Sequence, residues 1–207
     1  MGIKNLFDYL VCKIKREEFW ISSHSKLKVL DVGCGEGQRI HRYGSTWCGV
    51  DINKEVLAKA NEKKIRAYYG NATKLPFKNN EFDVVLSFNL IEHLSPGEAY
   101  KHLVESLRVL KINGTILLSS PMARNEFWGT FSHIRPYPPT SLIKISDARY
   151  GETFEKLNFV VEDVFYFGYC NIKLPILSQI VFGLTTILSN LGCDFLAGSY
   201  IAKLKKM

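Results

Sequence analysis

The chain has 207 residues, of which 46% are hydrophobic and 23% are charged. This length fits one ordinary domain, and we expect a single domain spanning residues 1–207. The composition excludes disordered, collagen-like and membrane-bundle chains. The 27 Lys and Arg residues against 20 Asp and Glu give a net charge of +7, which favours the approach of acidic or phosphorylated partners and anionic membrane surfaces.

The cysteines indicate a reducing compartment. There are five, an odd number, and they are widely scattered with no Cys-x-x-Cys pair. Neither a disulfide framework nor a zinc site is therefore predicted. The N-terminal residues lack a long apolar run followed by a small-residue cleavage site, so they do not resemble a secretory signal. We expect a cytoplasmic protein.

The first 25 residues predict an amphipathic helix, because apolar side chains recur at helical spacing. One hypothesis is a helix that covers the edge of the domain. The other is a basic amphipathic helix that binds a membrane or a partner. The apolar positions are Ile3, Leu6, Phe7, Leu10, Val11 and Ile14.

From residue 28 onward, short β-rich apolar runs alternate with helical patterns. This alternation is typical of βαβ units, so it predicts an α/β fold with a parallel sheet. The expected strands are residues 28–32, 47–52, 67–69, 82–88, 115–119, 160–167 and 200–205. The expected helices are residues 38–43, 54–63, 96–110 and 141–157.

A segment near the C-terminus has no charged residue from position 174 to 193. Its length would allow a membrane span, but polar residues interrupt it and its apolar residues follow one helical face over 177–191, so an amphipathic helix is favoured. One hypothesis packs this helix on the domain or over a substrate pocket. The alternative docks it on a membrane or on an apolar substrate.

A glycine-rich turn follows the first expected strand, in residues 28–37 (KVLDVGCGEG). Gly33, Gly35 and Gly37 permit positive φ angles and a close approach of the backbone to a ligand. The helix that follows offers free N–H groups to an anionic group. The loop therefore predicts a site for a nucleotide-like ligand.

Asp51 ends the next expected strand, 20 residues after Asp31. At this spacing a carboxylate can accept both hydroxyls of a ribose. The glycine spacing differs from the Gly-x-Gly-x-x-Gly of dinucleotide enzymes, and the Lys-Ser or Lys-Thr of a phosphate loop is absent from the motif. A pyrophosphate ligand and an NAD-dependent oxidoreductase are therefore disfavoured.

Four segments in sequence order resemble class I S-adenosylmethionine-dependent methyltransferases: residues 29–37 (VLDVGCGEG), 49–51 (GVD), 70–86 (GNATKLPFKNNEFDVVL) and 87–93 (SFNLIEH). The resemblance covers roughly residues 26–165. The last two segments are close to the broad group that methylates small molecules, quinones, lipids and glycans. The resemblance implies a Rossmann-like three-layer sandwich whose seven-stranded sheet is mostly parallel, with an antiparallel last strand.

The resemblance also implies roles for individual residues toward S-adenosyl-L-methionine. Asp31 and the three glycines would hold its methionine portion, because an ammonium prefers a carboxylate and a carboxylate prefers amide donors. Asp51 would bind the ribose. The remaining cofactor-binding positions are Ile52 on the adenine face, Asn71 and Ala72 at the adenine edge, and Phe88, Asn89 and Leu90 on the methionine and methyl side. Taken singly, the two aspartates and Asn71 could equally be turn or capping residues.

The acceptor is expected to bind between residues 120 and 195, after the central strands. His93 and His133 are the candidate catalytic residues, as a base or as acceptor-orienting groups, and structural roles are the alternative. The candidate substrate-binding residues are Trp128, Arg135 and Tyr137, in or near a segment (SHIRPY, residues 132–137) that resembles the His-x-Arg segment of small-molecule and glycan-modifying relatives.

The predicted function is transfer of a methyl group to a small-molecule, lipid or lipid-linked glycan acceptor, with peripheral membrane contact as one option. No metal-ligand pattern and no nucleic-acid module is present in the sequence. The alternatives are a catalytically silent nucleoside-binding regulatory protein and an RNA or protein methyltransferase.

Overall fold

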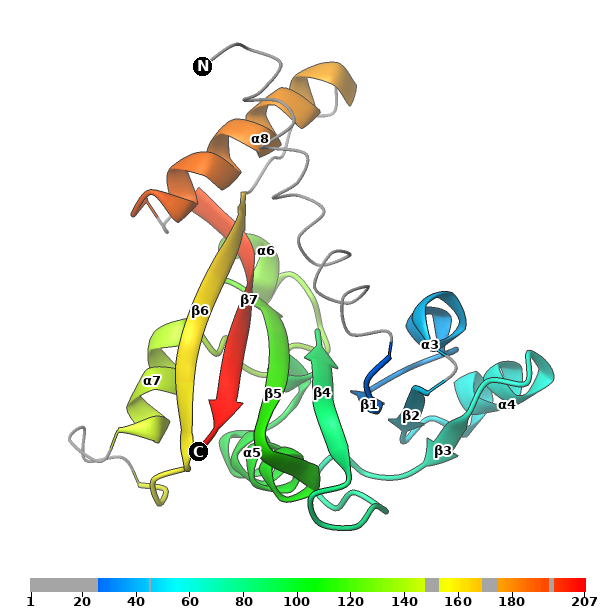
Figure 1. Cartoon of the computed structure of the whole chain (residues 1–207). Helices are drawn as coiled ribbons and strands as arrows, with labels where there is room; N and C mark the ends of the chain where they lie inside the picture. Colours follow the sequence, from blue (N-terminus) through cyan, green and yellow to red (C-terminus); the bar gives the residue numbers. More distant parts are fainter. Residues whose placement is uncertain (1–25, 45, 148–152, 169–174, 194–195) are drawn as a thin grey trace.

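The structure is a computed structural model that describes residues 26–44, 46–147, 153–168, 175–193 and 196–207. Its centre is a seven-stranded sheet in the order β3-β2-β1-β4-β5-β7-β6 (Figure 1). The strands are β1 (Val29–Val32), β2 (Cys48–Asp51), β3 (Ala67–Tyr69), β4 (Phe82–Phe88), β5 (Leu110–Pro121), β6 (Phe159–Gly168) and β7 (Ala197–Lys206).

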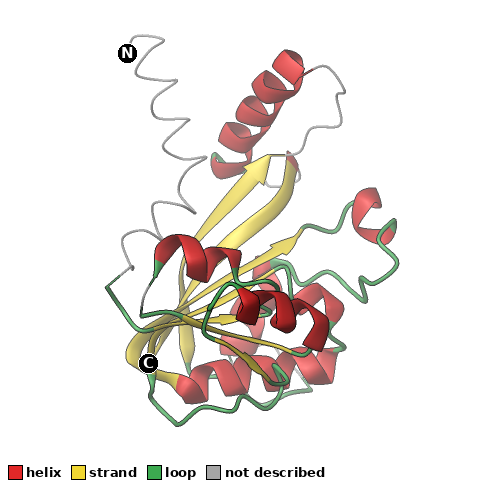
Figure 2. Ribbon diagram, turned by 90° about the vertical axis from the view of Figure 1, so that its right-hand side faces the viewer, coloured by secondary structure: helices red, strands yellow, loops and turns green. Residues whose placement is uncertain are grey.

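Helices cover both faces of this sheet (Figure 2). Residues of α5 and α7 join one buried cluster, and residues of α3 and α4 join the other. The helices are α3 (Gln38–Tyr43), α4 (Lys54–Glu62), the short 3-10 helix η1 (Ile91–His93), α5 (Pro96–Val109), α6 (Asn125–Trp128), α7 (Pro139–Ser146) and α8 (Pro175–Asn190).

The direction of the strands agrees with the predicted fold class. β1 pairs in parallel with β2 and β4, and β4 pairs in parallel with β5. β7 pairs antiparallel with both β5 and β6. The Rossmann-like three-layer sandwich with an antiparallel last strand is confirmed.

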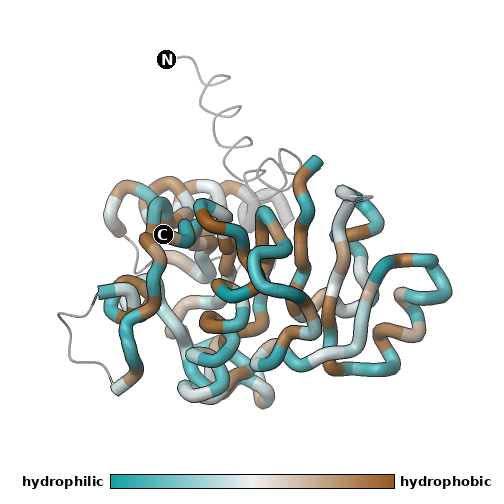
Figure 3. The backbone as a smooth tube through the Cα atoms, turned by 60° about the horizontal axis from the view of Figure 1, so that its bottom comes forward, coloured by the Kyte–Doolittle hydropathy of each residue, from teal (hydrophilic) through white to brown (hydrophobic). Residues whose placement is uncertain are grey.

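The core follows from the two-residue period of the strands. Along β4, Val85 faces the cluster that contains α5, whereas Val84 and Leu86 face the cluster that contains α3 and α4. Each of these side chains is at most 2% exposed. Near-continuous apolar strands are expected where helices cover both faces of a parallel sheet, and Figure 3 shows apolar stretches in the middle of the molecule as well as in outer segments.

One expected helix is shorter than predicted, and another lies outside the described residues. The helix expected over residues 141–157 is α7, which starts at Pro139, because a proline suits the first helical turn, and ends at Ser146. Residues 153–157 are not helical, and Leu157 donates from its backbone N–H to the Ile145 carbonyl. The helix expected in residues 1–25 lies outside the described residues.

The uncharged segment forms α8, so the predicted amphipathic helix is confirmed. It packs on the last three residues of β6. Within the described residues, no helix is long and apolar enough to cross a membrane.

Candidate active site

The glycine-rich turn lies between β1 and α3, at the carboxyl edge of the sheet. Ligands bind at this edge in open α/β folds. The backbone N–H groups of Gly33 and Cys34 both donate to the Val50 carbonyl, at 2.8 and 3.2 Å. These bonds fix the turn against the end of β2. The last residue of β2 is Asp51, which is predicted to bind the ribose.

Two glycines in this turn have a geometric reason to be glycine. Gly37 has φ 72°, and a Cβ placed there would lie 2.6 Å from Cγ2 of Ile65. Gly35 has φ 54°, and a Cβ there would meet nothing within 4 Å. The backbone at Gly35 therefore borders open space, as a close approach of a ligand requires.

Asp51 holds the glycine turn through its carboxylate. Its Oδ2 accepts from the Gly35 N–H at 2.9 Å, and its Oδ1 accepts from the Asn53 N–H at 2.8 Å. A carboxylate has about four lone-pair positions, so capacity remains for the two hydroxyls of a ribose. The next side chain, Ile52, is 60% exposed beside the site, which suits an apolar surface for an adenine ring.

Asp31 is fully buried in β1 and forms an ion pair with Arg39, at 3.6 Å. The Arg39 guanidinium also lies 4.9 Å from the centre of the Phe88 ring. Phe88 is itself only 5% exposed. Arg39 therefore connects two of the predicted cofactor residues, one on β1 and one on β4, and the sequence motifs did not identify it.

Asn71 and Ala72 follow β3 in a turn. The Asn71 side-chain oxygen accepts from the backbone N–H and the hydroxyl of Thr73, each at 2.9 Å. The amide nitrogen of the same side chain is a donor, which is the group that an acceptor nitrogen at an adenine edge requires. The role of this pair toward the cofactor stays a prediction.

Asn89 and Leu90 continue from the carboxyl end of β4. Asn89 has φ 51°, a left-handed conformation that asparagine tolerates better than most residues. Its backbone N–H donates to the Ser119 carbonyl at 3.1 Å. A Cβ on Gly33 would lie 3.4 Å from Cδ1 of Leu90, so this segment borders the glycine turn as the cofactor prediction requires.

The two candidate histidines come together at η1. The ring centres of His93 and His133 lie 5.0 Å apart in an edge-to-face arrangement. His93 Nδ1 lies 3.0 Å from the Ser132 carbonyl, and the Ile134 N–H donates to the Glu92 carbonyl at 2.8 Å. These reciprocal bonds dock the loop after β5 on η1.

The hydrogen-bond partners of the two rings indicate their tautomers. His133 Nδ1 lies 3.1 Å from the Phe127 carbonyl, and His93 Nδ1 bonds to another carbonyl. A carbonyl oxygen only accepts, so Nδ1 must carry the hydrogen in both rings. In the neutral form each ring then has its lone pair on Nε2. Both histidines therefore keep a basic nitrogen for another partner.

Glu92 is a buried carboxyl beside this pair. It is 1% exposed, and its Oε2 has no hydrogen-bond partner in the described part of the chain. Burial raises the pKa of Glu92, and the neighbouring His93, Ser120 and His133 lower it in part. One carboxylate oxygen and one ring nitrogen from each histidine lie within 4.8 Å of one another, a set that could also hold a metal ion.

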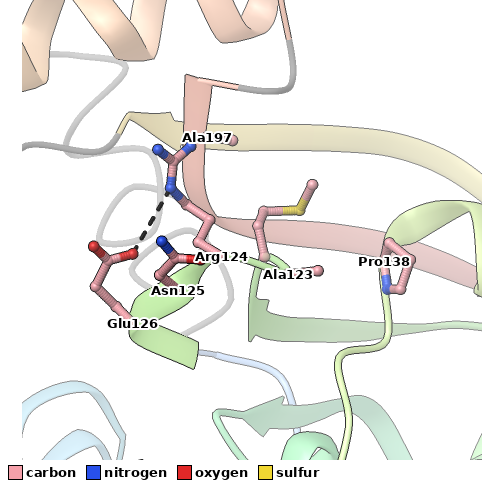
Figure 4. A pocket seen from close by; sticks show the side chains of 7 residues that line it. Ala123, Arg124, Asn125, Glu126, Pro138 and Ala197 are labelled. Atoms are coloured by element: carbon pink, nitrogen blue, oxygen red, sulfur yellow. Dashed lines mark ion pairs between the residues drawn. The ribbon is translucent and has the colours of Figure 1, made fainter. Parts of the chain in front are cut away.

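A cavity of about 390 Å³ opens between the end of β5, the start of β7 and the start of α7 (Figure 4). Arg124 and Glu126 form an ion pair at 4.0 Å on one side of it. A smaller cavity of about 130 Å³ shares Arg124 and Glu126 and is lined also by His133. The larger cavity is lined by Met122, Ala123, Arg124, Asn125, Glu126, Pro138 and Ala197.

The three predicted substrate-binding residues lie in different environments. Trp128 is 62% exposed at the end of α6. Arg135 is exposed, with its guanidinium 5.2 Å from the centre of the Tyr137 ring. Tyr137 is 8% exposed, and its hydroxyl donates to the Leu94 carbonyl at 2.9 Å. Tyr137 therefore supports the loop from inside the core, and none of the three lines either cavity.

Sequence reasoning missed three side chains in this region: Arg39, Glu92 and Arg124. Glu92 precedes a candidate histidine, but its burial depends on the loop that returns over η1. Arg124 and Glu126 line the cavity because α6, a helix of only four residues, positions them there. So short a helix has too few turns to give an apolar periodicity.

Comparisons with known proteins identify similar sequences. Residues 30–118 match the family described as "Methyltransferase domain". A probable S-adenosylmethionine-dependent methyltransferase of Mycolicibacterium smegmatis is 29% identical over 168 residues, which are 72% of this chain and 63% of the relative. A malonyl-[acyl-carrier protein] O-methyltransferase of Herminiimonas arsenicoxydans is 31% identical over 145 residues, which are 65% of this chain and 55% of the relative.

The fold has counterparts among solved structures. A SAM-dependent methyltransferase from Archaeoglobus fulgidus superposes with a TM-score of 0.67 and 20% identity, over 99% of this chain and all of that one. Residues 30–118 thus resemble a methyltransferase domain, and the whole chain shares the fold of a solved SAM-dependent methyltransferase. The chain covers less than two thirds of the length of the two curated relatives described above.

Proposed function

We propose that the chain transfers a methyl group from S-adenosyl-L-methionine to a small-molecule, lipid or lipid-linked glycan acceptor. The observation that carries this proposal is the position of the His93–His133 pair. His93 follows the carboxyl end of β4, and His133 lines the smaller cavity after β5. A cofactor at the glycine turn and an acceptor in these cavities would both lie at one edge of the sheet.

The residues at the glycine turn fit the proposed cofactor. Open space at Gly35 admits the ligand, Asp51 has lone pairs left for ribose hydroxyls, and Ile52 offers an apolar surface to adenine. Asp31 supplies a buried negative charge on the methionine side. When bound, S-adenosyl-L-methionine supplies an electrophilic methyl carbon on a positively charged sulfur.

The histidines would act on the acceptor. An acceptor oxygen or nitrogen loses a proton as its new bond to carbon forms and the bond from that carbon to sulfur breaks. His133 is the better candidate for this proton because it lines a cavity and its Nδ1–H is already held by Phe127. Its Nε2 lone pair can take the proton directly or through one water. Alignment of the acceptor supplies the rest of the acceleration.

The cavities favour an acceptor with both apolar and polar parts. Met122, Ala123, Pro138 and Ala197 line the larger one beside the Arg124–Glu126 ion pair. Arg124 can bind an anionic group such as a phosphate or carboxylate. A lipid, a lipid-linked glycan or a small amphiphilic molecule meets this description.

Transfer of a labelled methyl group tests the proposal. The protein is incubated with methyl-labelled S-adenosyl-L-methionine and separate lipid, small-molecule, RNA and protein fractions of a cell extract. We expect S-adenosylhomocysteine and label in the lipid or small-molecule fraction, at a rate at least about a hundredfold lower with the His133→Gln variant. Label only in RNA or protein would overturn the acceptor class. Cofactor binding without turnover on any fraction would favour a catalytically silent nucleoside-binding protein.

A further inference from the structure

Helix α8 packs on the sheet through its polar side chains. Asn190 Oδ1 accepts from the Tyr166 N–H at 3.2 Å, and Asn190 Nδ2 donates to the Tyr166 carbonyl at 2.7 Å. One turn earlier, the Thr186 hydroxyl accepts from the Gly168 N–H at 2.7 Å. Thr186 and Ser189 are each 1% exposed. The side chains of Thr186, Ser189 and Asn190 therefore face the protein.

The reason lies in the position of β6 at the edge of the sheet. An edge strand leaves a row of backbone N–H and carbonyl groups without a neighbouring strand. The Asn190 side chain bonds to the backbone N–H and carbonyl of Tyr166, and the Thr186 hydroxyl accepts from the Gly168 N–H. The approach is close, because a Cβ on Gly168 would lie 2.1 Å from Oγ1 of Thr185. Only polar side chains on α8 can make these bonds.

The opposite face of α8 is consequently apolar and exposed. It carries Ile180, Leu184 and Leu188, which are 54, 53 and 43% exposed, and Leu191, directly after the helix, is 76% exposed. We call these four residues the α8 ridge. The usual arrangement buries the apolar stripe of a helix against the core, and here it is reversed.

The α8 ridge lies at the acceptor end of the molecule. The end of β6 to which α8 binds pairs with the start of β7, Gly168 with Ala197, and Ala197 lines the larger cavity. Figure 1 shows α8 beyond the ends of β6 and β7, on the side toward which β4 points. Two further large apolar side chains near this end, Trp128 and Phe131, are exposed as well.

We propose that the α8 ridge docks the protein on the surface of a lipid bilayer. The ridge is wholly aliphatic, and no charged residue occurs from position 174 to 193. A helix of 16 residues is about 24 Å long, which is too short to span a bilayer but suited to lying in its interface.

The charge of the chain and its first 25 residues favour the same occupant. The net charge of +7 attracts anionic headgroups. Residues 1–25, outside the described part, combine apolar residues at helical spacing with Lys4, Lys13, Lys15 and Arg16. Two amphipathic segments give a more stable attachment than one. This docking surface does not depend on the proposed methyl transfer.

Vesicle sedimentation tests the docking surface without any acceptor or cofactor. The full chain is mixed with vesicles of phosphatidylcholine containing phosphatidylglycerol. The test variant is Leu184→Ser with Leu188→Ser, and its control is Ile112→Ser with Ile143→Ser, which removes side chains of similar exposure, 60 and 43%, from β5 and α7. Because all four positions are exposed, both variants should fold, and circular dichroism verifies this.

We expect the wild type and the control to sediment with the vesicles, and the ridge variant to lose at least about tenfold in partitioning. Equal binding of all three proteins, or no binding of the wild type, would overturn the proposal. Light scattering without vesicles covers a further outcome. If the wild type is a dimer and the ridge variant is a monomer, the ridge forms a contact between two copies of the chain. That result would also overturn the proposal of membrane docking.

Discussion

His93 and His133 lie with their ring centres 5.0 Å apart, although one follows β4 and the other lies in the loop after β5. Each donates from Nδ1 to a backbone carbonyl, so each neutral ring keeps the lone pair of Nε2. The fold thus brings the two imidazole rings together after β4, the strand whose carboxyl end is predicted to line the methyl side of the cofactor.

Replacement of His133 by glutamine should lower kcat by about 10²- to 10⁴-fold, the usual contribution of a general base. Glutamine can still donate to the Phe127 carbonyl, so the loop and the affinity for S-adenosyl-L-methionine should persist. Steady-state rates and calorimetric binding measure the two effects separately. His41→Gln, at an exposed position on α3, is the control. An unchanged kcat would exclude His133 as the base.

The Glu92, His93 and His133 cluster also allows a test of metal dependence. The sequence predicts no metal, so chelator treatment should leave the rate unchanged and the purified protein should contain far less than one metal ion per chain. Element analysis gives the content directly. One equivalent of metal that disappears in His133→Gln would show that these atoms, which lie within 4.8 Å of one another, are metal ligands instead.

Gly37→Ala should reduce the free energy of unfolding by about 1–3 kcal/mol, because φ 72° strains an L-residue and the new Cβ would lie 2.6 Å from Ile65. Gly97→Ala is the matched control. Gly97 lies in α5, and a Cβ there would meet nothing within 4 Å, so alanine should be neutral or stabilising. Urea unfolding of the three proteins gives the comparison, and equal losses at both positions would contradict the tight turn.

His102 should make the protein less stable as the pH falls. It is fully buried, its Nε2 bonds to the Ser87 hydroxyl at 2.8 Å, and burial lowers its pKa to about 4. Since the unfolded chain binds the proton near pH 6.5, stability is lost as the pH drops below that value. Urea unfolding at pH 7 and pH 5 should show a loss of about 2 kcal/mol that His102→Gln lacks. The same loss in the variant would refute this cause.

Asn190→Leu should lower the free energy of unfolding by about 1–3 kcal/mol, because it leaves the Tyr166 N–H and carbonyl without their side-chain partners. Leu188→Ala, on the exposed side of α8, should change it by less than about 0.5 kcal/mol. Urea unfolding measures both. The opposite ranking would mean that α8 packs through its apolar side.

The strands and the glycine-rich turn could be predicted because their signals are local. The apolar residues of β4 predict a strand without reference to the strands that pair with it. The turn from Gly33 to Gly37 is predicted because it directly follows the residues of β1. The orientation of α8 could not be predicted in this way. Its amphipathic pattern shows two faces, but which face packs depends on β6 being an edge strand, a fact of the whole topology. The contact of His93 with His133 likewise depends on a loop that returns from β5.

The measurement that tests cofactor binding most directly is a calorimetric titration with S-adenosyl-L-methionine and S-adenosylhomocysteine. We predict one site per chain for the wild type, an affinity at least about tenfold weaker for Asp51→Asn, and wild-type affinity for Glu55→Gln on α4. No binding of either ligand by the folded wild type would contradict the assignment of the glycine turn and Asp51 as the cofactor site.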